Sequence, residues 1–438
     1  MLLNIVIIGA GPAGEAAAKC AAQMGASVTL VEKEHAGGLC LNKGCVPSKT
    51  LLEQIRNATL SGKTVDWTEI QKVKQGVVTG IRSQLETSLK TLKIKFIQGS
   101  ARFTNPTTID VTSANSSQSL SFDKAIIAAG TDIFIPKPLD EHRADIFDSD
   151  RILELKKTPS SILIVGGGAV GCEFACLLNA AGTKVTMVEL TDTLLPGEDA
   201  GVSTALANAY EARGINVITG TKVTALERKG HEWHVTLSNG QQLKVAELLS
   251  CVGRFIHLTP LALEKAGIQI TSNTLPLNPF LQTSNPNIYA AGDVTGQTRL
   301  AHAAAIQGRI AALNALGGSE QYDGSLIPRC LYSWPEVASV GKAKHTVEQE
   351  KKPVKTSRAF FKGSAKALAA QEAEGFVQIV SDPETGVILG AQIIGLHATE
   401  LIHVFSVALK KQMTLKEFGD VIFAHPSLSE VMRDAARR

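Results

Sequence analysis

The sequence predicts an α/β protein with two copies of a strand–loop–helix–strand unit, followed by a smaller region of mixed strands and helices. Three observations support this prediction: a glycine-rich pattern that occurs twice, apolar strand segments without polar alternation, and a change of character after Pro335. Uninterrupted apolar strands are typical of parallel sheets that are buried on both faces. With 438 residues, the chain is long enough for about three domains.

The first unit begins with an apolar segment over residues 5–8, which we predict to be a buried strand. The loop over 9–14 reads Gly-Ala-Gly-Pro-Ala-Gly, an alanine-rich helix follows up to about Gly25, and a second strand over 28–31 ends at Glu32. Glycines in such a loop let the backbone approach a pyrophosphate, and the helix N-terminus attracts that anion. The terminal acid accepts hydrogen bonds from an adenosine ribose.

The same pattern returns 157 positions later, with Gly166 in the place of Gly9. The second copy comprises a strand over residues 162–165, a loop over 166–171, a helix that stops at Gly182 and a strand over 185–188 that ends at Glu189. Because the glycines, the helix end and the acid all keep their offsets, we predict two Rossmann-like dinucleotide sites. A glycine-rich turn without a ligand is the alternative for either copy.

Two dinucleotide sites in one chain suggest FAD together with a nicotinamide nucleotide. The carboxylate of Glu189 would repel a 2′-phosphate, and no Lys or Arg lies between residues 190 and 198 to attract one. We therefore predict NAD(H) rather than NADP(H).

The remaining elements suggest three domains, with a boundary near residue 325. We predict one or two helices over 66–92, a helix from about 300 and another over 398–411. Strands are predicted over 108–111, 125–129, 288–293 with its turn, 376–380 and 387–394, before a closing loop and helix. The expected domains are an FAD-type domain over 1–145 that is completed by 270–325, an NAD-type domain over 146–269, and a C-terminal domain over 326–438.

Cys40 and Cys45 form a closely spaced pair in a glycine-rich segment. A disulfide needs Cα atoms within about 4.4–6.8 Å, and the flanking glycines allow an irregular backbone that could bring the two cysteines together. Pro47 suits the first turn of a helix, so Cys45 lies near a helix N-terminus, where the thiolate is favoured. The spacing differs from the C-x-x-C of zinc sites, and no second pair completes a metal set. Two structural thiols in a loop remain the alternative.

Composition excludes several classes of function. Charged residues make up 19%, the formal net charge is +3, and no Lys/Arg block stands out, so neither nucleic acid nor a membrane surface is an expected partner. No apolar run approaches the ~18 residues of a membrane helix. The seven cysteines are scattered and odd in number, which argues against a secreted disulfide framework. We expect no targeting peptide and a cytoplasmic location.

The Cys40–Cys45 segment resembles the redox-active signature of the flavoprotein disulfide reductases, a family that includes dihydrolipoamide dehydrogenase, glutathione reductase and mercuric reductase. The likeness runs from about Asn4 to Arg433. Further matching motifs, in the order of the family, are Val252-Gly253-Arg254, Ala291-Gly292-Asp293 and the tail His425-Pro426-Ser427-Leu428-Ser429-Glu430. The resemblance implies an FAD domain, an NAD domain, a C-terminal α+β dimerisation domain and a homodimer.

The resemblance also implies catalytic roles. Cys45 would lie beside the flavin, and Cys40 would exchange disulfides with the substrate. Lys49 would pair with Glu173 near the flavin, although the sequence alone favours solvated helix residues at both positions. His425 would act as a general base, since imidazole titrates near neutral pH, with Glu430 holding the ring; on the sequence alone a surface histidine is favoured.

Cofactor-binding residues follow from the two repeats and the resemblance, which places Asp293 on the FAD ribityl chain. The expected FAD set is Gly9, Gly11, Gly14, Glu32, Lys49, Gly130, Gly292, Asp293 and Ala301, and the expected NAD set is Gly166, Gly168, Gly171, Glu189 and Gly253.

The tail and the segment over 395–401 are most similar to the dihydrolipoamide dehydrogenase branch, which oxidises dihydrolipoamide and reduces NAD⁺. The last cysteine is Cys330, so the adjacent C-terminal cysteine pair of mercuric reductases is missing. The resemblance implies, as a possible partner, the lipoyl-bearing acyltransferase of a 2-oxo acid dehydrogenase complex.

Departures from the family pattern keep alternatives open. Ala129 replaces the usual Thr of an Ala-Thr-Gly turn, and Phe255-Ile256-His257 stands where Pro-Asn is usual. The alternatives are a related NAD(P)H-dependent disulfide or mercuric-type reductase with another substrate, a flavin NADH oxidase or transhydrogenase with incidental cysteines, and a non-catalytic FAD-binding scaffold.

Overall fold

The computed structural model describes residues 2–114, 116–271 and 274–438 and divides the chain into two compact units. The first unit comprises Met1–Leu51, Glu69–Phe134 and Gly253–Gly324, and the second comprises Leu52–Thr68, Ile135–Val252 and Ser325–Arg438. The three-domain division expected from the sequence stays a prediction.

A parallel five-stranded sheet forms the centre of the first unit. Its strands, in spatial order, are β18 (Ile288–Ala290), β7 (Lys124–Ile127), β1 (Asn4–Ile8), β2 (Ser27–Glu32) and β3 (Lys95–Gln98). The apolar residues of β1, β2, β7 and β18 are buried on both faces, as the lack of alternation predicts, whereas Phe96 in the edge strand β3 is exposed. Strand β7 ends at Ile127 rather than at the predicted Ala129, because the Ala128 N–H donates to Ile8 at the end of the ladder and the chain then turns at Gly130 (φ +72°).

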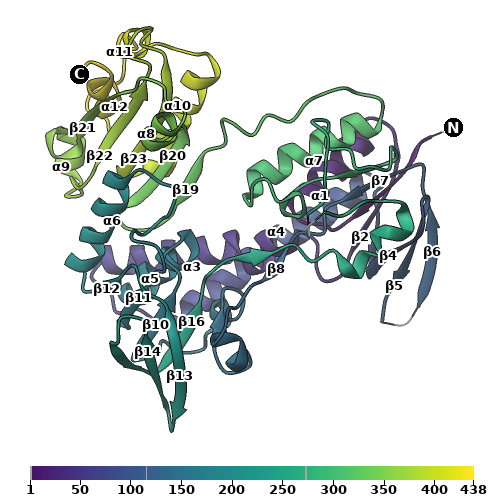
Figure 1. Cartoon of the computed structure of the whole chain (residues 1–438), viewed down its shortest axis with the longest axis horizontal. Coiled ribbons are helices and arrows are strands. Elements are labelled where there is room, and N and C mark those ends of the chain that lie inside the picture. Colours follow the sequence, from purple (N-terminus) through teal and green to yellow (C-terminus); the bar gives the residue numbers. More distant parts are fainter. Residues whose placement is uncertain (1, 115, 272–273) are drawn as a thin grey trace. The chain divides into compact units, whose positions relative to one another are not determined.

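Helices α1 (Pro12–Gln23) and α7 (Ala301–Ala315) lie side by side against this sheet (Figure 1). A β-carbon at Gly308 would lie 2.0 Å from the carbonyl oxygen of Ala13, so glycine is what permits this close approach.

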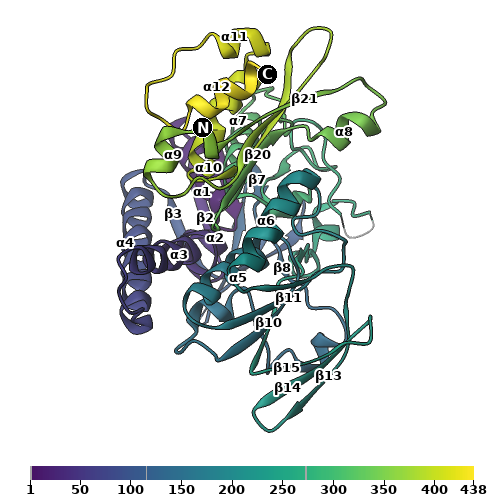
Figure 2. The same cartoon turned by 90° about the vertical axis from the view of Figure 1, so that its left-hand side faces the viewer.

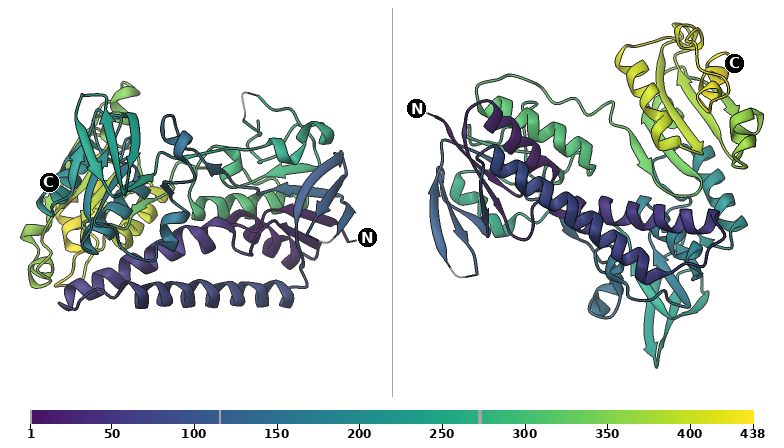
Figure 3. Two further views of the ribbon diagram at one scale, coloured as in Figure 1. Left: turned by 90° about the horizontal axis from the view of Figure 1, so that it is seen from below. Right: turned by 180° about the vertical axis from the view of Figure 1, so that it is seen from behind.

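The first unit also contains two smaller sheets and the segment with Cys40 and Cys45. The antiparallel sheet β4 (Ser100–Asn105), β5 (Thr108–Thr112) and β6 (Ser117–Ser121) appears in blue in Figure 3, and β8 (Asp132–Ile133) pairs with β17 (Arg254–Phe255). Helix α2 (Gly38–Lys43) belongs to this unit, as do the first part of α3 (Cys45–Leu60), up to Leu51, and α4 (Trp67–Thr91) from Glu69 on. Helix α4 is a single helix over most of the predicted range 66–92.

The second unit contains another parallel sheet, which repeats the core of the first. Its strands, in order, are β12 (Asn216–Ile218), β11 (Lys184–Val188), β10 (Ser161–Val165), β16 (Glu247–Ser250) and β9 (Phe147–Asp148). Helices α5 (Ala169–Ala180) and α6 (Ala200–Ala212) belong to it, and the antiparallel sheet β13 (Val223–Lys229), β14 (Glu232–Leu237) and β15 (Gln242–Val245) is labelled in Figure 2.

The C-terminal region of the second unit forms an antiparallel sheet covered by helices. The strands, in order, are β19 (Arg329–Leu331), β20 (Glu336–Gly341), β23 (Ile388–Gly395), β22 (Phe376–Ser381) and β21 (Lys355–Phe360). The helices are α8 (Lys344–Gln349), α9 (Ala365–Ala369), α10 (Ala398–Lys410), α11 (Leu415–Gly419) and α12 (Glu430–Ala436). Apolar side chains of α10 and α12 share one core with the face of the sheet that includes Val340 and Ile393.

Candidate active site

The first glycine loop is tied to the acid at the end of β2. Gly9 has φ +102°, and a β-carbon there would lie 2.2 Å from the Ala128 carbonyl oxygen, so no side chain fits. Glu32 is 7% exposed, and its Oε2 accepts from the Ala10 N–H at 2.8 Å. The carboxylate therefore lies directly at the loop, as the dinucleotide pattern predicts.

The same loop fits a pyrophosphate. Helix α1 begins directly after Gly11, and in the described part of the chain no side chain caps this helix N-terminus. The N–H groups and the positive end of the helix dipole are left to attract an anion. A β-carbon at Gly38 would lie 2.6 Å from the Gly11 Cα. A side chain at Gly38 would therefore fill the space beside the glycine loop in which a pyrophosphate fits.

Cys40 and Cys45 come together across a break between two helices. Cys40 belongs to α2, Cys45 is the first residue of α3, and Gly44 separates the helices. The hydrogen bond with the Cys45 thiol, followed by burial, raises the pKa of the Cys40 thiol. A β-carbon at Gly44 would lie 3.3 Å from the Cys40 Cα, so glycine keeps the two segments close. The flanking glycines allow the irregular backbone that the sequence suggests: Gly37 and Gly38 have φ angles of +91° and +55°, and Gly44 breaks the helix between the two cysteines.

The side chain of Asn42 holds α2 in place. Its amide nitrogen donates to the carbonyl oxygens of Ala36 at 3.0 Å and Gly38 at 2.8 Å, and its oxygen accepts from Arg82 Nε at 2.8 Å. Sequence reasoning did not single out Asn42, although it is a polar residue between the two cysteines.

The Gly292–Asp293 turn is fixed from two sides in the first unit. The Gly292 N–H donates to Oε1 of the fully buried Gln307 at 2.7 Å, and Asp293 Oδ2 accepts from the Thr131 hydroxyl at 3.4 Å. Burial raises the pKa of the Asp293 carboxyl, against the lowering effects of the Thr131 hydrogen bond and the nearby cation of Arg254.

The second unit repeats the loop-and-acid arrangement. Gly166 has φ +109°, and its β-carbon would lie 2.6 Å from the Cys251 carbonyl oxygen. Glu189 accepts from the Gly167 N–H at 2.5 Å and from the Thr191 N–H and hydroxyl at 2.8 and 2.9 Å. Helix α5 begins after Gly168, as α1 begins after Gly11, so this loop also fits a dinucleotide phosphate.

Glu173 is buried in α5, with 6% of its surface exposed, and it accepts from the Tyr332 N–H at 3.1 Å. The sequence alone favours an exposed helix acid here. That interpretation is wrong, because Glu173 lies on the face of α5 that packs against β19 and its following loop. Lys49 belongs to the first unit and Glu173 to the second, so the pairing of these residues stays a prediction.

His425 and Glu430 form a hydrogen-bonded pair. His425 Nδ1 lies 3.2 and 3.1 Å from the two carboxylate oxygens of Glu430, and the imidazole side chain is 75% exposed. The Ser427 N–H donates to Glu430 at 3.1 Å and, together with His425, lowers the pKa of the Glu430 carboxyl. A carboxylate only accepts hydrogen bonds, so Nδ1 carries the proton and Nε2 is left as an acceptor.

Comparison with known proteins decides the family. Residues 3–308 match the pyridine nucleotide-disulphide oxidoreductase family, and residues 327–436 match the dimerisation domain of the same family.

The chain belongs to the pyridine nucleotide-disulphide oxidoreductases.

This family membership is supported by curated relatives over nearly the whole length. Dihydrolipoyl dehydrogenase of Chlamydia pneumoniae is 36% identical and covers 99% of this chain and 96% of the relative. Dihydrolipoyl dehydrogenase of Bacillus subtilis is also 36% identical, over 99% of this chain and 98% of the relative. The chain is thus an enzyme of the dihydrolipoyl dehydrogenase-like type, and FAD and NAD are its cofactors.

Solved structures of this oxidoreductase family have the same fold. LpdA from Mycobacterium tuberculosis matches with a TM-score of 0.92 and 28% identity, and covers 100% of this chain and 99% of that chain. A Cu(II) complex of RclA, an HOCl-induced flavoprotein disulfide reductase from Escherichia coli, matches with a TM-score of 0.92, 26% identity and the same coverage. Both confirm the predicted α/β architecture.

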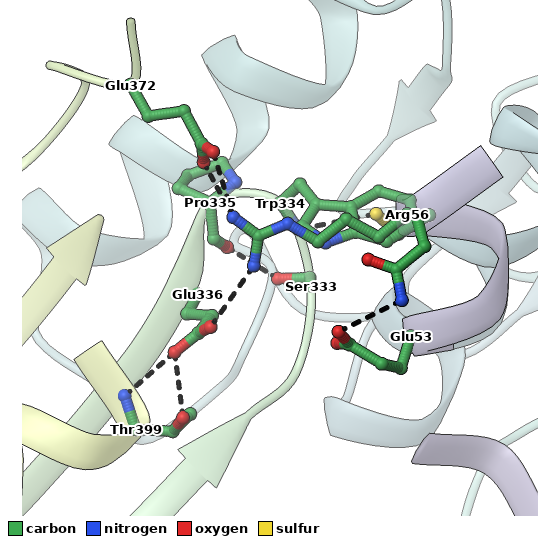
Figure 4. A network of polar contacts seen from close by, with 10 residues as sticks. Glu53, Arg56, Ser333, Trp334, Pro335, Glu336, Glu372 and Thr399 are labelled. Carbon is green, nitrogen blue, oxygen red and sulfur yellow. Dashed lines mark hydrogen bonds and ion pairs between the residues drawn. The ribbon is translucent and has the colours of Figure 1, made fainter. Parts of the chain in front are cut away.

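A polar network joins α3 of this oxidoreductase to its C-terminal region (Figure 4). Arg56 donates to both carboxylate oxygens of Glu372 at 2.9 Å and lies 3.8 Å from Glu336. Glu336 in turn accepts from the N–H and hydroxyl of Thr399, at the start of α10. The helix that begins at Cys45 is therefore fixed at its far end by an ion pair.

The remaining predicted cofactor residues lie at turns and helix starts. Gly130 (φ +72°) and Gly253 (φ +121°) both have positive φ angles, and a β-carbon on either would meet no described atom within 4 Å. Ala301 is the first residue of α7. Within residues 2–114, 116–271 and 274–438, no helix is both long and apolar enough to cross a membrane.

Proposed function

We propose that this enzyme oxidises dihydrolipoamide to lipoamide and reduces NAD⁺, through Cys40 and Cys45. The observation that carries the proposal is that Cys40 in α2 and Cys45, the first residue of α3, come together across Gly44, whose β-carbon would lie 3.3 Å from the Cys40 Cα. The dihydrolipoyl dehydrogenase relatives, 32–36% identical over 98–99% of the chain, support this substrate.

The exchange begins from the Cys40–Cys45 disulfide. One substrate thiol loses its proton and attacks Cys40, which breaks the disulfide and leaves Cys45 as a thiolate at the N-terminus of α3, where the helix dipole stabilises it. The second substrate thiol then attacks the mixed disulfide, releases the oxidised substrate and leaves Cys40 as a thiol. FAD, when bound, supplies the acceptor for the two electrons of this dithiol and the hydride donor to NAD⁺.

His425 takes the substrate proton in this proposal. Glu430 holds the protonated Nδ1, so Nε2 faces outward as the base. We propose a homodimer in which His425 and Glu430 serve the active site of the other subunit, in keeping with the match to the dimerisation domain.

The remaining site residues are assigned as proposals, from the geometry of the two glycine loops and from the resemblance to the family. Lys49 pairs with Glu173 beside the flavin and stabilises negative charge on the reduced ring. FAD is held by Gly9, Gly11, Gly14, Glu32, Lys49, Gly130, Gly292, Asp293 and Ala301, and NAD by Gly166, Gly168, Gly171, Glu189 and Gly253. We also propose a cytoplasmic location and, as the partner, a lipoyl-bearing acyltransferase of a 2-oxo acid dehydrogenase complex.

Preference for NAD rests on Glu189. Its carboxylate is already bound to N–H groups of the loop and would repel a 2′-phosphate. We expect a higher kcat/KM with NADH than with NADPH in steady-state assays, and the reverse order would overturn this assignment.

The test of the function is an anaerobic substrate screen with lipoamide, glutathione disulfide and Hg²⁺ as acceptors for NADH. We expect lipoamide turnover that falls about a thousandfold or more in Cys45→Ser, because the exchange needs both sulfurs. NADH oxidation by ferricyanide serves as the control for an intact flavin site. If Cys45→Ser leaves turnover of the physiological acceptor intact, the enzyme is an NADH oxidase or transhydrogenase instead.

A second candidate is a flavoprotein disulfide reductase that acts on a substrate other than lipoamide. The structural match to the HOCl-induced flavoprotein disulfide reductase RclA favours it, as do the departures at Ala129 and Phe255. In the same screen this candidate predicts that lipoamide fails while another disulfide is reduced.

A further inference from the structure

We propose that Thr131 and Arg254 are positioning residues for Asp293. Their hydrogen bonds orient the Asp293 carboxylate so that one of its oxygens can accept a hydrogen bond from FAD. This inference rests on the proposed role of Asp293 in FAD binding. Neither residue is in the proposed cofactor set, and all three residues belong to the first unit.

The contacts form a relay from Arg254 to Asp293. Arg254 Nη2 donates to the Thr131 carbonyl oxygen at 2.7 Å, and Nε donates to the Thr131 hydroxyl oxygen at 3.1 Å. The Thr131 hydroxyl lies 3.4 Å from Asp293 Oδ2. Strand β8 begins directly after Thr131, and Arg254 is the first residue of β17, where it lies opposite Ile133, so backbone pairing fixes the positions of both residues.

The direction of this relay follows from donor chemistry. A guanidinium has five N–H donors and no acceptor, so the Thr131 oxygen must accept from Arg254. The one hydroxyl proton of Thr131 is then available for Asp293 Oδ2, which must accept as a carboxylate. The contact is long for an O–H···O bond, so its contribution is orientation more than affinity.

In this arrangement one carboxylate oxygen of Asp293, Oδ2, accepts a hydrogen bond from the protein. Among the residues that the structure describes, Oδ1 of Asp293 has no hydrogen-bond partner, and it is available to accept from a hydroxyl of FAD. Burial raises the pKa of the Asp293 carboxyl, while the Thr131 hydrogen bond and then the charges of Arg254 and Arg299 lower it. The relay therefore favours the ionised, accepting form in a site where burial disfavours it.

The experiment measures FAD release from the full-length holoenzyme, followed as free flavin fluorescence after dilution, from pH 8 down to the lowest pH at which the holoenzyme stays folded. Thr131→Val removes the hydroxyl at nearly constant shape, and Thr131→Ser keeps it. We expect Thr131→Val to release FAD about three- to tenfold faster at pH 7, because the Thr131 hydroxyl no longer orients the Asp293 carboxylate toward FAD. Thr131→Ser should behave like the wild type.

The pH dependence separates positioning from general damage to the fold. Protonated Asp293 loses an acceptor, so FAD release should accelerate as the pH falls through the pKa of Asp293. Without the Thr131 hydroxyl this pKa rises further, so the midpoint should move to higher pH in Thr131→Val and stay in place in Thr131→Ser. Equal release rates and midpoints in all three proteins would overturn the relay.

Asp293→Asn distinguishes failure of the relay from failure of the proposed FAD site. If Asp293→Asn releases FAD faster but Thr131→Val does not, only the relay is wrong. If Asp293→Asn leaves release unchanged, the role of Asp293 in FAD binding is wrong. Should Thr131→Val not fold, Thr131→Ala gives the same comparison with Thr131→Ser.

Discussion

At the scale of single residues, the cysteines of this enzyme lie in contrasting environments. Cys172 and Cys176 are buried in α5, and burial raises the pKa of both thiols, that of Cys176 to about 12. The Cys176 sulfur also accepts from the Trp334 N–H at 3.3 Å. Cys45, by contrast, is exposed at the start of a helix. Because the raised pKa keeps the buried cysteines protonated, they lack the thiolate that reacts as the nucleophile.

This contrast predicts selective alkylation. When the enzyme is reduced with NADH and treated with iodoacetamide at pH 7, we expect Cys45 to be modified before Cys172 and Cys176, because the thiolate form and access to the reagent are both needed. Peptide mass spectrometry over a time course measures the order. The unfolded protein, in which all these sites should react alike, is the control. Equally rapid modification of Cys172 in the native enzyme would contradict the prediction.

Glu430 gives a second prediction at this scale. Glu430→Gln keeps the shape but replaces a charged acceptor of the His425 Nδ1 proton with a neutral amide. We expect kcat with lipoamide to fall about ten- to a hundredfold, because an orienting partner of this kind is lost. Steady-state kinetics measures this, while ferricyanide-dependent NADH oxidation should stay constant. An unchanged kcat would show that the His425–Glu430 pair has no part in proton transfer.

At the scale of elements, the pattern of the two glycine loops predicted more of the fold than did local propensity. The offsets from Gly9 to Gly166 correctly predicted both parallel units, because the loop, the helix N-terminus and the acid must occur together to bind a dinucleotide. The helix α2 was missed because its six residues lie between glycines and show no helical period. The burial of Glu173 was also missed, since it depends on packing against residues about 160 positions away, such as Tyr332.

The packing of α1 against α7 predicts a strong effect of one methyl group. In Gly308→Ala the added β-carbon would lie 2.0 Å from the Ala13 carbonyl oxygen, so the helices must separate. We expect the free energy of unfolding to fall by about 1–3 kcal/mol. The matched control is Gly76→Ala in the exposed face of α4, where nothing described lies within 4 Å and alanine should stabilise the helix by about 0.5–1 kcal/mol. Urea unfolding of both variants measures the difference.

At the scale of the whole molecule, a complete active site is proposed to need two subunits. Cys45 and His425 lie in different units of the chain, and residues 327–436 match a dimerisation domain. The sequence could suggest this only through the resemblance of the tail, since composition carries no trace of an assembly. The spacing of the motifs also cannot tell which disulfide is the substrate. That choice depends on the shape of the substrate site rather than on the residues that transfer the electrons.

Mixed dimers test the shared site. Cys45→Ser and His425→Gln subunits, co-expressed with two different tags, should each be inactive alone with lipoamide. The mixed dimer has one site of its two with both an intact Cys45 and an intact His425 from the other subunit, so the purified mixed dimer should have about half of the wild-type activity. Activity of the doubly purified mixed dimer measures this. No recovery at all would mean that each site uses the cysteines and histidine of a single chain.

The break at Gly44 has a consequence for turnover. Since Cys40 lies in one short helix and Cys45 starts the next, forming or breaking the bond between the sulfurs requires rotation about a few bonds near this junction. Helix α3 beyond Cys45 need not bend, and Arg56 anchors its far end. The change between the disulfide and the dithiol can therefore stay local to the junction at Gly44, and the hydrophobic core need not rearrange in a catalytic cycle.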